Sequence, residues 1–130
     1  MSIGRLVAAF FAAAALSGCE AESPEPASSA FDGTYAGSIQ LTGGNNAGNC
    51  PPTASAQLII SGGELEYTHY NGAAVVRATA HADGSFFGWG INKNSGHTQI
   101  VDGKIQGDLV EGSARNPLCK YQVHLKRVSS

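Results

Sequence analysis

The sequence has few charges and no apolar run long enough to cross a bilayer as a helix. Only 14% of the 130 residues are charged, and residues 31–130 carry equal numbers of basic and acidic side chains. Nucleic-acid binding needs a basic surface that neutralises phosphates, so we expect no nucleic-acid partner. The longest apolar run, residues 6–16, is about half of the ~20 residues that a membrane-spanning helix needs.

Catalytic and metal-binding motifs are also missing. The sequence contains no GxSxG nucleophile elbow, no HExxH and no phosphate-binding loop of Walker type. Its four histidines, at positions 69, 81, 97 and 124, fall on or beside separate predicted strands, whereas a metal site needs three or four converging ligands. We therefore expect no enzymatic activity, no cofactor and no metal.

The N-terminal residues have the pattern of an export signal. Arg5 supplies a positive charge, residues 6–16 are an uncharged apolar run, and small residues precede Cys19. The motif Leu16-Ser17-Gly18-Cys19 resembles the lipobox of bacterial lipoproteins, in which the signal peptide is removed and the cysteine thiol is acylated. The resemblance implies a lipid such as palmitate on Cys19 and attachment to a membrane of the cell envelope. The alternative is an ordinary signal peptide with a chance cysteine.

The following segment, residues 20–30, is acidic and rich in Pro and Ser and has no large apolar side chain. Such a segment cannot bury enough surface to offset the entropy lost on ordering. The expected organisation is a signal peptide over 1–18, a lipidated cysteine with a flexible tether over 19–30, and a folded domain over 31–130. In lipoproteins the residue after the cysteine influences sorting, and Glu20 in place of aspartate favours the outer membrane, facing the periplasm.

The three cysteines of the chain are an odd number. If Cys19 carries a lipid, Cys50 and Cys119 remain as a pair. An oxidising periplasm favours a disulfide between them. The alternative, a two-cysteine metal site, lacks the CxxC spacing or a histidine at motif spacing.

Short stretches of period-two alternation, separated by glycine-rich turns, predict an all-β domain. The predicted strands cover residues 33–42, 54–60, 64–70, 73–80, 85–91, 97–101, 104–111 and 118–127. Asn71-Gly72 has the strongest hairpin signal, and Asp102-Gly103 is read as a further turn. The order favours a small eight-stranded antiparallel up-and-down barrel, with a meander sandwich as the alternative. Closure would bring the first and last strands together and place the Cys50–Cys119 disulfide at the seam.

In this topology the longer connections share one end of the barrel, and the tether enters at the other end. The predicted long loops are residues 43–53, 92–96 and 112–117. Because loops carry function more often than the scaffold does, this distal rim is the expected binding surface. The candidate rim residues are Asn45, Asn46, Asn49, Asn92, Asn94, His97, Arg115 and Asn116. The alternative is that these are tolerated loop lengths without a function.

Aromatic residues cluster in two predicted strands and are expected to fill the barrel core. They are Tyr67, Tyr70, Phe86, Phe87 and Trp89. Alternation places Phe87 and Trp89 on the face opposite Phe86. Any that line the mouth of the barrel instead could contact a small apolar ligand.

The triplet Gly33-Thr34-Tyr35 resembles the Gly-x-Trp that opens lipocalin and avidin-type barrels, with Tyr in place of Trp. The resemblance implies that Arg127 packs on the Tyr35 ring through a cation–π contact. A domain this small is expected to fill its interior with side chains. The architecture also resembles periplasmic inhibitors of secreted metalloproteases and lysozymes.

These observations favour a lipid-anchored, non-enzymatic binding module that acts through its distal rim. The expected partners are the membrane, an envelope or secreted protein, or a small apolar ligand. A lipocalin-like carrier and an inhibitor of a secreted hydrolase are the alternatives.

Overall fold

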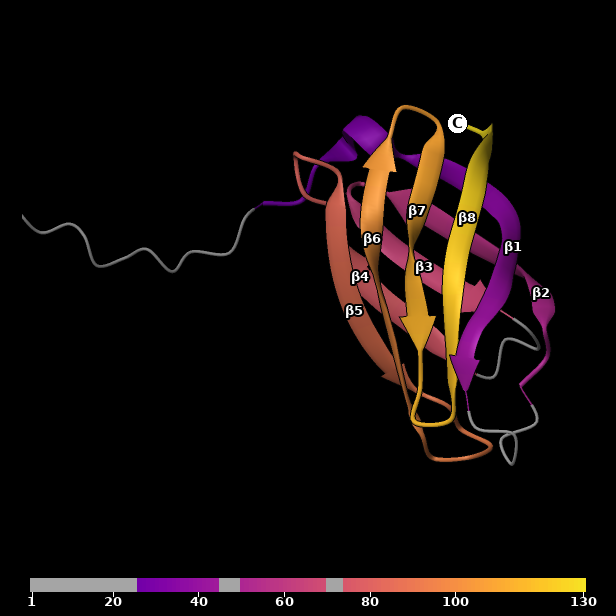
Figure 1. Ribbon diagram of the computed structural model, residues 1–130. Helices are drawn as coiled ribbons and strands as arrows, with labels where there is room; N and C mark the ends of the chain where they lie inside the picture. Colours follow the sequence, from indigo (N-terminus) through magenta and orange to yellow (C-terminus); the bar gives the residue numbers. More distant parts are fainter. Residues whose placement is uncertain (1–25, 45–49, 70–73) are drawn as a thin grey trace, which may run out of the picture.

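The computed structural model describes residues 26–44, 50–69 and 74–130, which form eight antiparallel strands closed into a barrel (Figure 1). Each strand pairs with the next one in the sequence, and β1 pairs with β8. The strands are β1 (Gly33–Gly44), β2 (Thr53–Ser61), β3 (Glu64–His69), β4 (Val75–Thr79), β5 (Ser85–Ile91), β6 (Thr98–Gln106), β7 (Leu109–Arg115) and β8 (Cys119–Ser129). The predicted up-and-down barrel is confirmed, and the sandwich alternative is excluded.

The side chains that point into the barrel follow the alternation of the sequence. In β8, Cys119, Tyr121, Val123 and Leu125 are buried, and the residues between them are exposed. The other strands add mainly aliphatic side chains to the same core. The interior is therefore packed by residues that the period-two pattern had marked as apolar.

The two ends of the barrel differ in the residues that point inward. Near the end where β1 begins, these are large and apolar and include Ile60, Leu65, Phe86, Ile105 and Leu125. Near the other end they are smaller or polar. This second group contains Ala56, His69, Ala74, Gln99, Ala114 and Tyr121. We call the first end proximal and the second end distal.

A short 3-10 helix, η2 (Ser29–Phe31), closes the proximal end before β1 begins. The Tyr35 hydroxyl donates to the Phe31 carbonyl oxygen at 2.7 Å. The Arg127 guanidinium lies 5.0 Å from the centre of the Tyr35 ring, which confirms the predicted cation–π contact. Arg127 also donates to the Asp32 carbonyl oxygen at 2.6 Å and to the Asp108 carboxylate at 3.0 Å. The last strand is thereby joined to the residues that precede the first.

We call the contacts of Arg127 with Tyr35, Asp32 and Asp108 the proximal latch. Asp32 connects it to a neighbouring turn. Its two carboxylate oxygens accept hydrogen bonds from the backbone amides of Gly62 and Gly63, at 2.7 and 3.0 Å. The backbone amide of Ser28 donates to the Ala80 carbonyl oxygen at 2.8 Å. Ordered contacts of the domain thus begin a few residues before Phe31, where the sequence predicted its boundary.

The predicted turn at Asp102-Gly103 is wrong, because both residues lie in the middle of β6. A Cβ atom at position 103 would sit 2.9 Å from the Phe86 ring and 2.6 Å from the Glu111 carbonyl oxygen. The glycine is needed for close packing within the sheet rather than for a change of direction. The chain turns instead at Gly107 and Asp108, where Gly107 has a φ of 60°.

This shift moves the following elements along the chain. Residues 112–115, predicted as part of a loop, belong to β7, and only residues 116–118 connect β7 to β8. Likewise, Gly43 and Gly44 continue β1 rather than opening the first loop. The difference in loop length between the two ends is therefore smaller than predicted.

The expected burial of Phe87 and Trp89 is also wrong, although their separation from the buried Phe86 is confirmed. Gly88 and Gly90 take the inward positions of β5, where a Cβ atom would meet backbone carbonyl oxygens of β4. The close approach of β4 leaves no room inside for larger side chains, so the two aromatic rings point outward. Tyr67 is buried as expected, and Tyr70 lies outside the described residues.

Candidate binding site at the distal end

The strands β1, β3, β5 and β7 end at the distal end of the barrel, where β2, β4, β6 and β8 begin (Figure 1). Three predicted rim residues, Asn45, Asn46 and Asn49, lie outside the described residues. The other five belong to the β5–β6 connection and to the end of β7 with the turn that follows.

In the β5–β6 connection, Asn92 shapes its own loop. Its side-chain oxygen accepts hydrogen bonds from the backbone amides of Asn94 and Ser95, at 2.8 and 3.2 Å. Its backbone amide donates to the His97 carbonyl oxygen at 2.8 Å. This is the local asparagine turn that replaces backbone pairing in loops. Of the three predicted residues here, Asn94 is exposed, while Asn92 and His97 are half-buried.

At the end of β7, Arg115 and Asn116 have separate roles. The Arg115 guanidinium donates to the Asp102 carboxylate at 3.1 Å, across the outer face of the sheet. The Asn116 side-chain oxygen accepts from the backbone amides of Leu118 and Cys119, both at 2.8 Å. Asn116 therefore fixes the turn that starts β8, and Arg115 belongs to the side of the barrel rather than to a rim loop.

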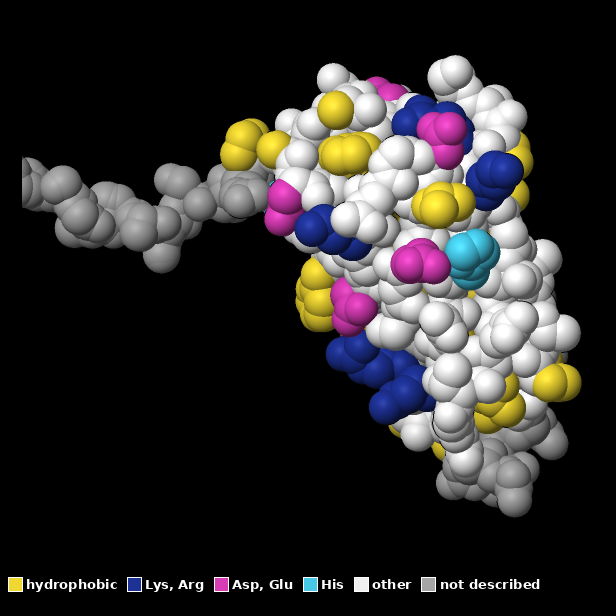
Figure 2. Space-filling view, turned by 45° about the horizontal axis from the view of Figure 1, so that its top comes forward, with side chains coloured by type: hydrophobic (Ala, Val, Ile, Leu, Met, Phe, Trp, Pro, Cys, Tyr) yellow, Lys and Arg dark blue, Asp and Glu magenta, His cyan; other side chains and the backbone are white. Residues whose placement is uncertain are grey.

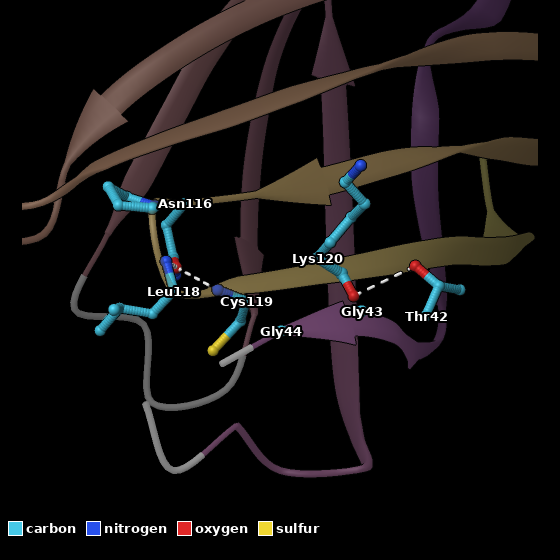
Figure 3. A pocket seen from close by; sticks show the side chains of 8 residues that line it. Thr42, Gly43, Gly44, Asn116, Leu118, Cys119 and Lys120 are labelled. Atoms are coloured by element: carbon cyan, nitrogen blue, oxygen red, sulfur yellow. Dashed lines mark hydrogen bonds between the residues drawn. The ribbon is translucent and has the colours of Figure 1, made fainter. Parts of the chain in front are cut away.

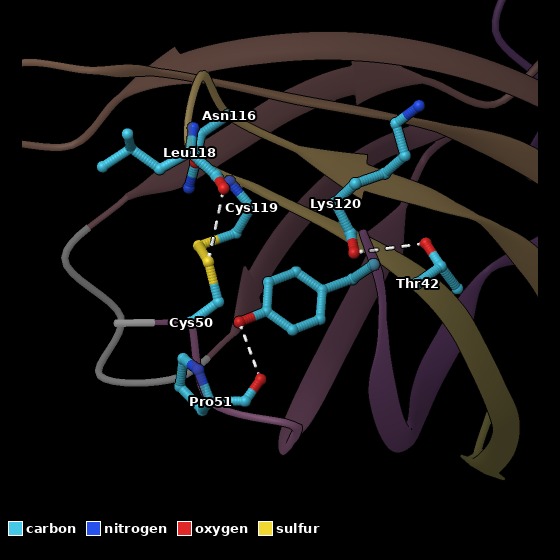
Figure 4. Close-up of a disulfide and its surroundings, with 8 residues drawn as sticks. Thr42, Cys50, Pro51, Asn116, Leu118, Cys119 and Lys120 are labelled. Atoms are coloured by element: carbon cyan, nitrogen blue, oxygen red, sulfur yellow. Dashed lines mark hydrogen bonds between the residues drawn. A yellow bond between two sulfur atoms is a disulfide. The ribbon is translucent and has the colours of Figure 1, made fainter. Parts of the chain in front are cut away.

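Cys50 and Cys119 form the predicted disulfide, with their Cα atoms 5.7 Å apart (Figure 4). Cys119 starts β8 and is paired with Gly44 at the end of β1. The Cys50 sulfur also lies 3.4 Å from the Leu118 carbonyl oxygen, a packing contact, since a disulfide sulfur has no proton to donate. The link fastens the end of the β1–β2 connection to the seam where the barrel closes.

A hollow of ≈ 540 Å³ lies on the outside of this seam and is largely open to solvent (Figure 3). Its lining residues are Thr42, Gly43, Gly44, Asn116, Pro117, Leu118, Cys119 and Lys120. The Thr42 hydroxyl donates to the Lys120 carbonyl oxygen at 3.2 Å and ties β1 to β8 beside the hollow. A Cβ atom at Gly43 would meet nothing within 4 Å, so the glycine leaves this wall flat.

Inside the barrel, beneath the same rim, two tyrosines and a histidine form a polar cluster. The Tyr67 hydroxyl and His69 Nδ1 are 2.9 Å apart, and the His69 ring centre lies 6.0 Å from that of Tyr121. The Tyr121 hydroxyl donates to the Pro51 carbonyl oxygen at 3.0 Å, next to the disulfide (Figure 4). The cluster therefore connects the core to the loop that the disulfide holds.

Burial keeps the cluster uncharged. It raises the pKa of the Tyr67 phenol and lowers the pKa of the His69 imidazole, because the interior solvates the charged forms poorly. At neutral pH the His69 imidazole is therefore neutral and the Tyr67 phenol is protonated. The cluster is therefore better suited to an uncharged ligand that forms hydrogen bonds than to an ion.

His69 and Tyr121 were not among the residues predicted for the site. Their signal was present in the alternation, which places both on inward positions at the distal ends of β3 and β8. The bond between Tyr67 and His69 follows from their spacing of two residues along one strand face. Their approach to Tyr121 depends on barrel closure, which brings distant strands together.

Within the described ranges, no three His, Cys, Asp or Glu side chains converge as a metal site would require. No helix in the same part of the chain has the length and hydropathy needed to cross a membrane. No protein-family model, curated protein or solved structure matches this chain.

Proposed function

We propose that this chain is an envelope lipoprotein, anchored through a lipid on Cys19, and that its barrel is a non-enzymatic binding module. The observation that carries the binding proposal is the difference between the two ends of the barrel. The proximal end is closed by η2 and by Arg127 on Tyr35. The distal end combines a surface hollow, a polar cluster and a disulfide-held loop.

The position of the anchor supports the same site. The described chain begins at the proximal end, where Ser28 bonds to Ala80. A tether there leaves the hollow beside Pro117 and Lys120 free to meet a partner from the periplasm. The hollow is an open surface rather than an enclosed cavity. A surface of this kind is suited to a protein partner, and we expect that partner to be an envelope or secreted protein.

A lipocalin-like carrier of a small ligand is the second candidate. It is favoured by the small inward side chains of Ala56, Ala74 and Ala114 next to the neutral Tyr67–His69 pair. A ligand there would be small, largely apolar, and able to exchange one or two hydrogen bonds with the cluster.

The anchor is tested by measuring the mass of the protein purified from the envelope. We expect the chain to begin at Cys19 and to carry acyl groups, and the Cys19→Ser variant to lack them. A wild-type chain that begins elsewhere, or carries no lipid, would refute the anchor.

The binding site is tested by photo-crosslinking in intact cells. A photoreactive residue in place of the exposed Pro117 or Lys120 should give adducts with one or a few envelope proteins. The matched control is the exposed Ser61, which ends β2 at the proximal end. Equal adducts at both ends would contradict a distal site. Adducts at neither end, with a small molecule co-purifying with the protein, would favour the carrier.

A further inference from the structure

The outer face of β5 exposes three large apolar side chains in a row. Phe87, Trp89 and Ile91 are 58%, 57% and 53% exposed. They alternate with inward glycines, so all three point to the same side of the sheet. Val75, on the neighbouring strand β4, is also exposed. A contiguous apolar patch of this kind on a protein surface marks a contact with a partner or a membrane.

This patch lies on the side of the barrel where the N-terminal segment joins the domain. Ser28 bonds to Ala80, which follows β4, and β5 begins at Ser85. Figure 2 shows hydrophobic side chains, with Lys and Arg side chains beside them, on the flank below the point where the N-terminal segment leaves. A partner held at the far end of that segment is therefore held near β5.

The length of the chain between Cys19 and Pro26 limits the distance between the bilayer surface and the barrel. Cys19 and Pro26 are separated by seven Cα–Cα steps, which reach at most about 25 Å. Strand β5, from Ser85 to Ile91, is itself about 20 Å long. The bilayer surface that holds the lipid thus lies at most about 25 Å from Pro26, a distance only slightly greater than the length of β5.

Two exposed basic side chains beside the patch suit the headgroup region of a bilayer, and acidic residues of β3 and β6 lie near them. Arg77 is paired directly with Trp89 across the β4–β5 register, is exposed, and forms an ion pair with Glu66 at 3.1 Å. Phe87 lies opposite Asp102 on β6. Lys104 lies opposite Ser85 on β6. Aromatic rings flanked by basic side chains are the residues found at membrane interfaces, where the apolar stems of the basic residues lie along apolar surface.

We propose that the outer face of β5 docks on the surface of the phospholipid bilayer, with Phe87, Trp89 and Ile91 entering the interface. This inference rests on the lipid anchor proposed above. In this arrangement the barrel lies on its β5 flank. Its distal end then points along the membrane surface and stays accessible to a partner.

The test uses the fact that Trp89 is the sole tryptophan of the chain, so its fluorescence reports on this patch alone. The mature protein is reconstituted into vesicles of phosphatidylethanolamine and phosphatidylglycerol, with and without brominated lipids. We expect the emission to move to shorter wavelength, brominated lipids to quench it, and iodide in the water to quench it less than it does without vesicles.

The variants Phe87→Ser and Ile91→Ser keep the reporter and remove its apolar neighbours. Each should shift the equilibrium between docked and undocked protein about tenfold towards undocked, read as weaker quenching by brominated lipids. The matched controls are Leu109→Ser and Val128→Ser, exposed apolar residues of β7 and β8, which should leave the quenching unchanged.

Three results would overturn the proposal. In the first, iodide reaches Trp89 equally with and without vesicles. In the second, Trp89 is shielded before vesicles are added and more so at higher protein concentration, which indicates a second copy. In the third, it is shielded before addition at every concentration, which indicates cover by the chain itself. The mass measurement shows separately whether Cys19 carries a lipid. If it does not, the same vesicles are added to the unlipidated protein, so docking of β5 is still tested when the anchor fails.

Discussion

Replacing Cys50 and Cys119 with alanine should lower the free energy of unfolding by about 4 kcal/mol. The disulfide joins residues 69 positions apart. In the chain-entropy model, a loop of that length restricts the unfolded chain by about this amount. Small domains are stable by only about 5–15 kcal/mol, so this single link is a large share of the total.

The effect should arise in the unfolded state, because the folded seam has other bonds. β1 and β8 remain paired along most of their length, and the Thr42 hydroxyl still reaches the Lys120 carbonyl. The double variant should therefore keep the far-ultraviolet circular dichroism spectrum of the wild type. Its unfolded chain should expand further, which raises the dependence of the unfolding free energy on urea.

The assay is equilibrium unfolding in urea. With a slope of about 2 kcal/mol/M, the midpoint should fall by about 2 M. Wild-type protein unfolded with a thiol reductant should reach the same midpoint as the double variant, which serves as the control for the loss of the side chains. Identical midpoints with and without the disulfide would refute the argument that the link restricts the unfolded chain.

Three further predictions use the same urea assay. Arg127→Ala should cost about 2–3 kcal/mol, because it removes charged hydrogen bonds and the contact with Tyr35; a neutral effect would contradict the proximal latch. Burial lowers the pKa of His69 in the folded state, so the unfolded chain binds a proton first and stability should fall as the pH drops below about 6.5. His69→Gln should flatten that fall, and an unchanged pH profile would count against it. Gly112→Ala should cost about 1–3 kcal/mol, since its Cβ atom would meet the backbone of β6. Gly43→Ala, which meets nothing within 4 Å, should change little, and equal losses for both would contradict the packing argument.

The fold was predictable wherever one face of a strand is buried. In β8, four buried residues alternate with exposed ones, and this pattern fixes both the strand and its inner face. The disulfide followed from the cysteine count and from the closure of the barrel. The contact of Arg127 with Tyr35 followed from the resemblance of the first strand to lipocalin-type barrels.

Glycine misled the prediction in two places, because one residue type serves different physical needs. Gly103 resembled a turn residue after Asp102, but it makes room for the Phe86 ring. Phe87 and Trp89 were expected in the core, but the close approach of β4 leaves room inside only for Gly88 and Gly90. The residues next to these glycines in the sequence do not indicate that another strand packs closely against them.

The site could be predicted only in part for the same reason. The rim asparagines were found from composition, but Asn92 and Asn116 prove to hold their own turns. The cluster of Tyr67, His69 and Tyr121 joins residues from two strands far apart in the sequence. It could be recognised only when the closed barrel was known.

The pairing of the first and last strands gives the barrel a fixed polarity with respect to its chain ends. Thr34 is paired with Ser129, so both ends leave the domain at the same side. A fluorescent protein fused after Ser130 would hang beside the tether and leave the distal end clear. A circularly permuted chain, with its natural ends joined and new ends opened at Pro117, would carry its tether on the distal rim. That rearranged barrel would carry its tether at the opposite end while keeping every strand in place.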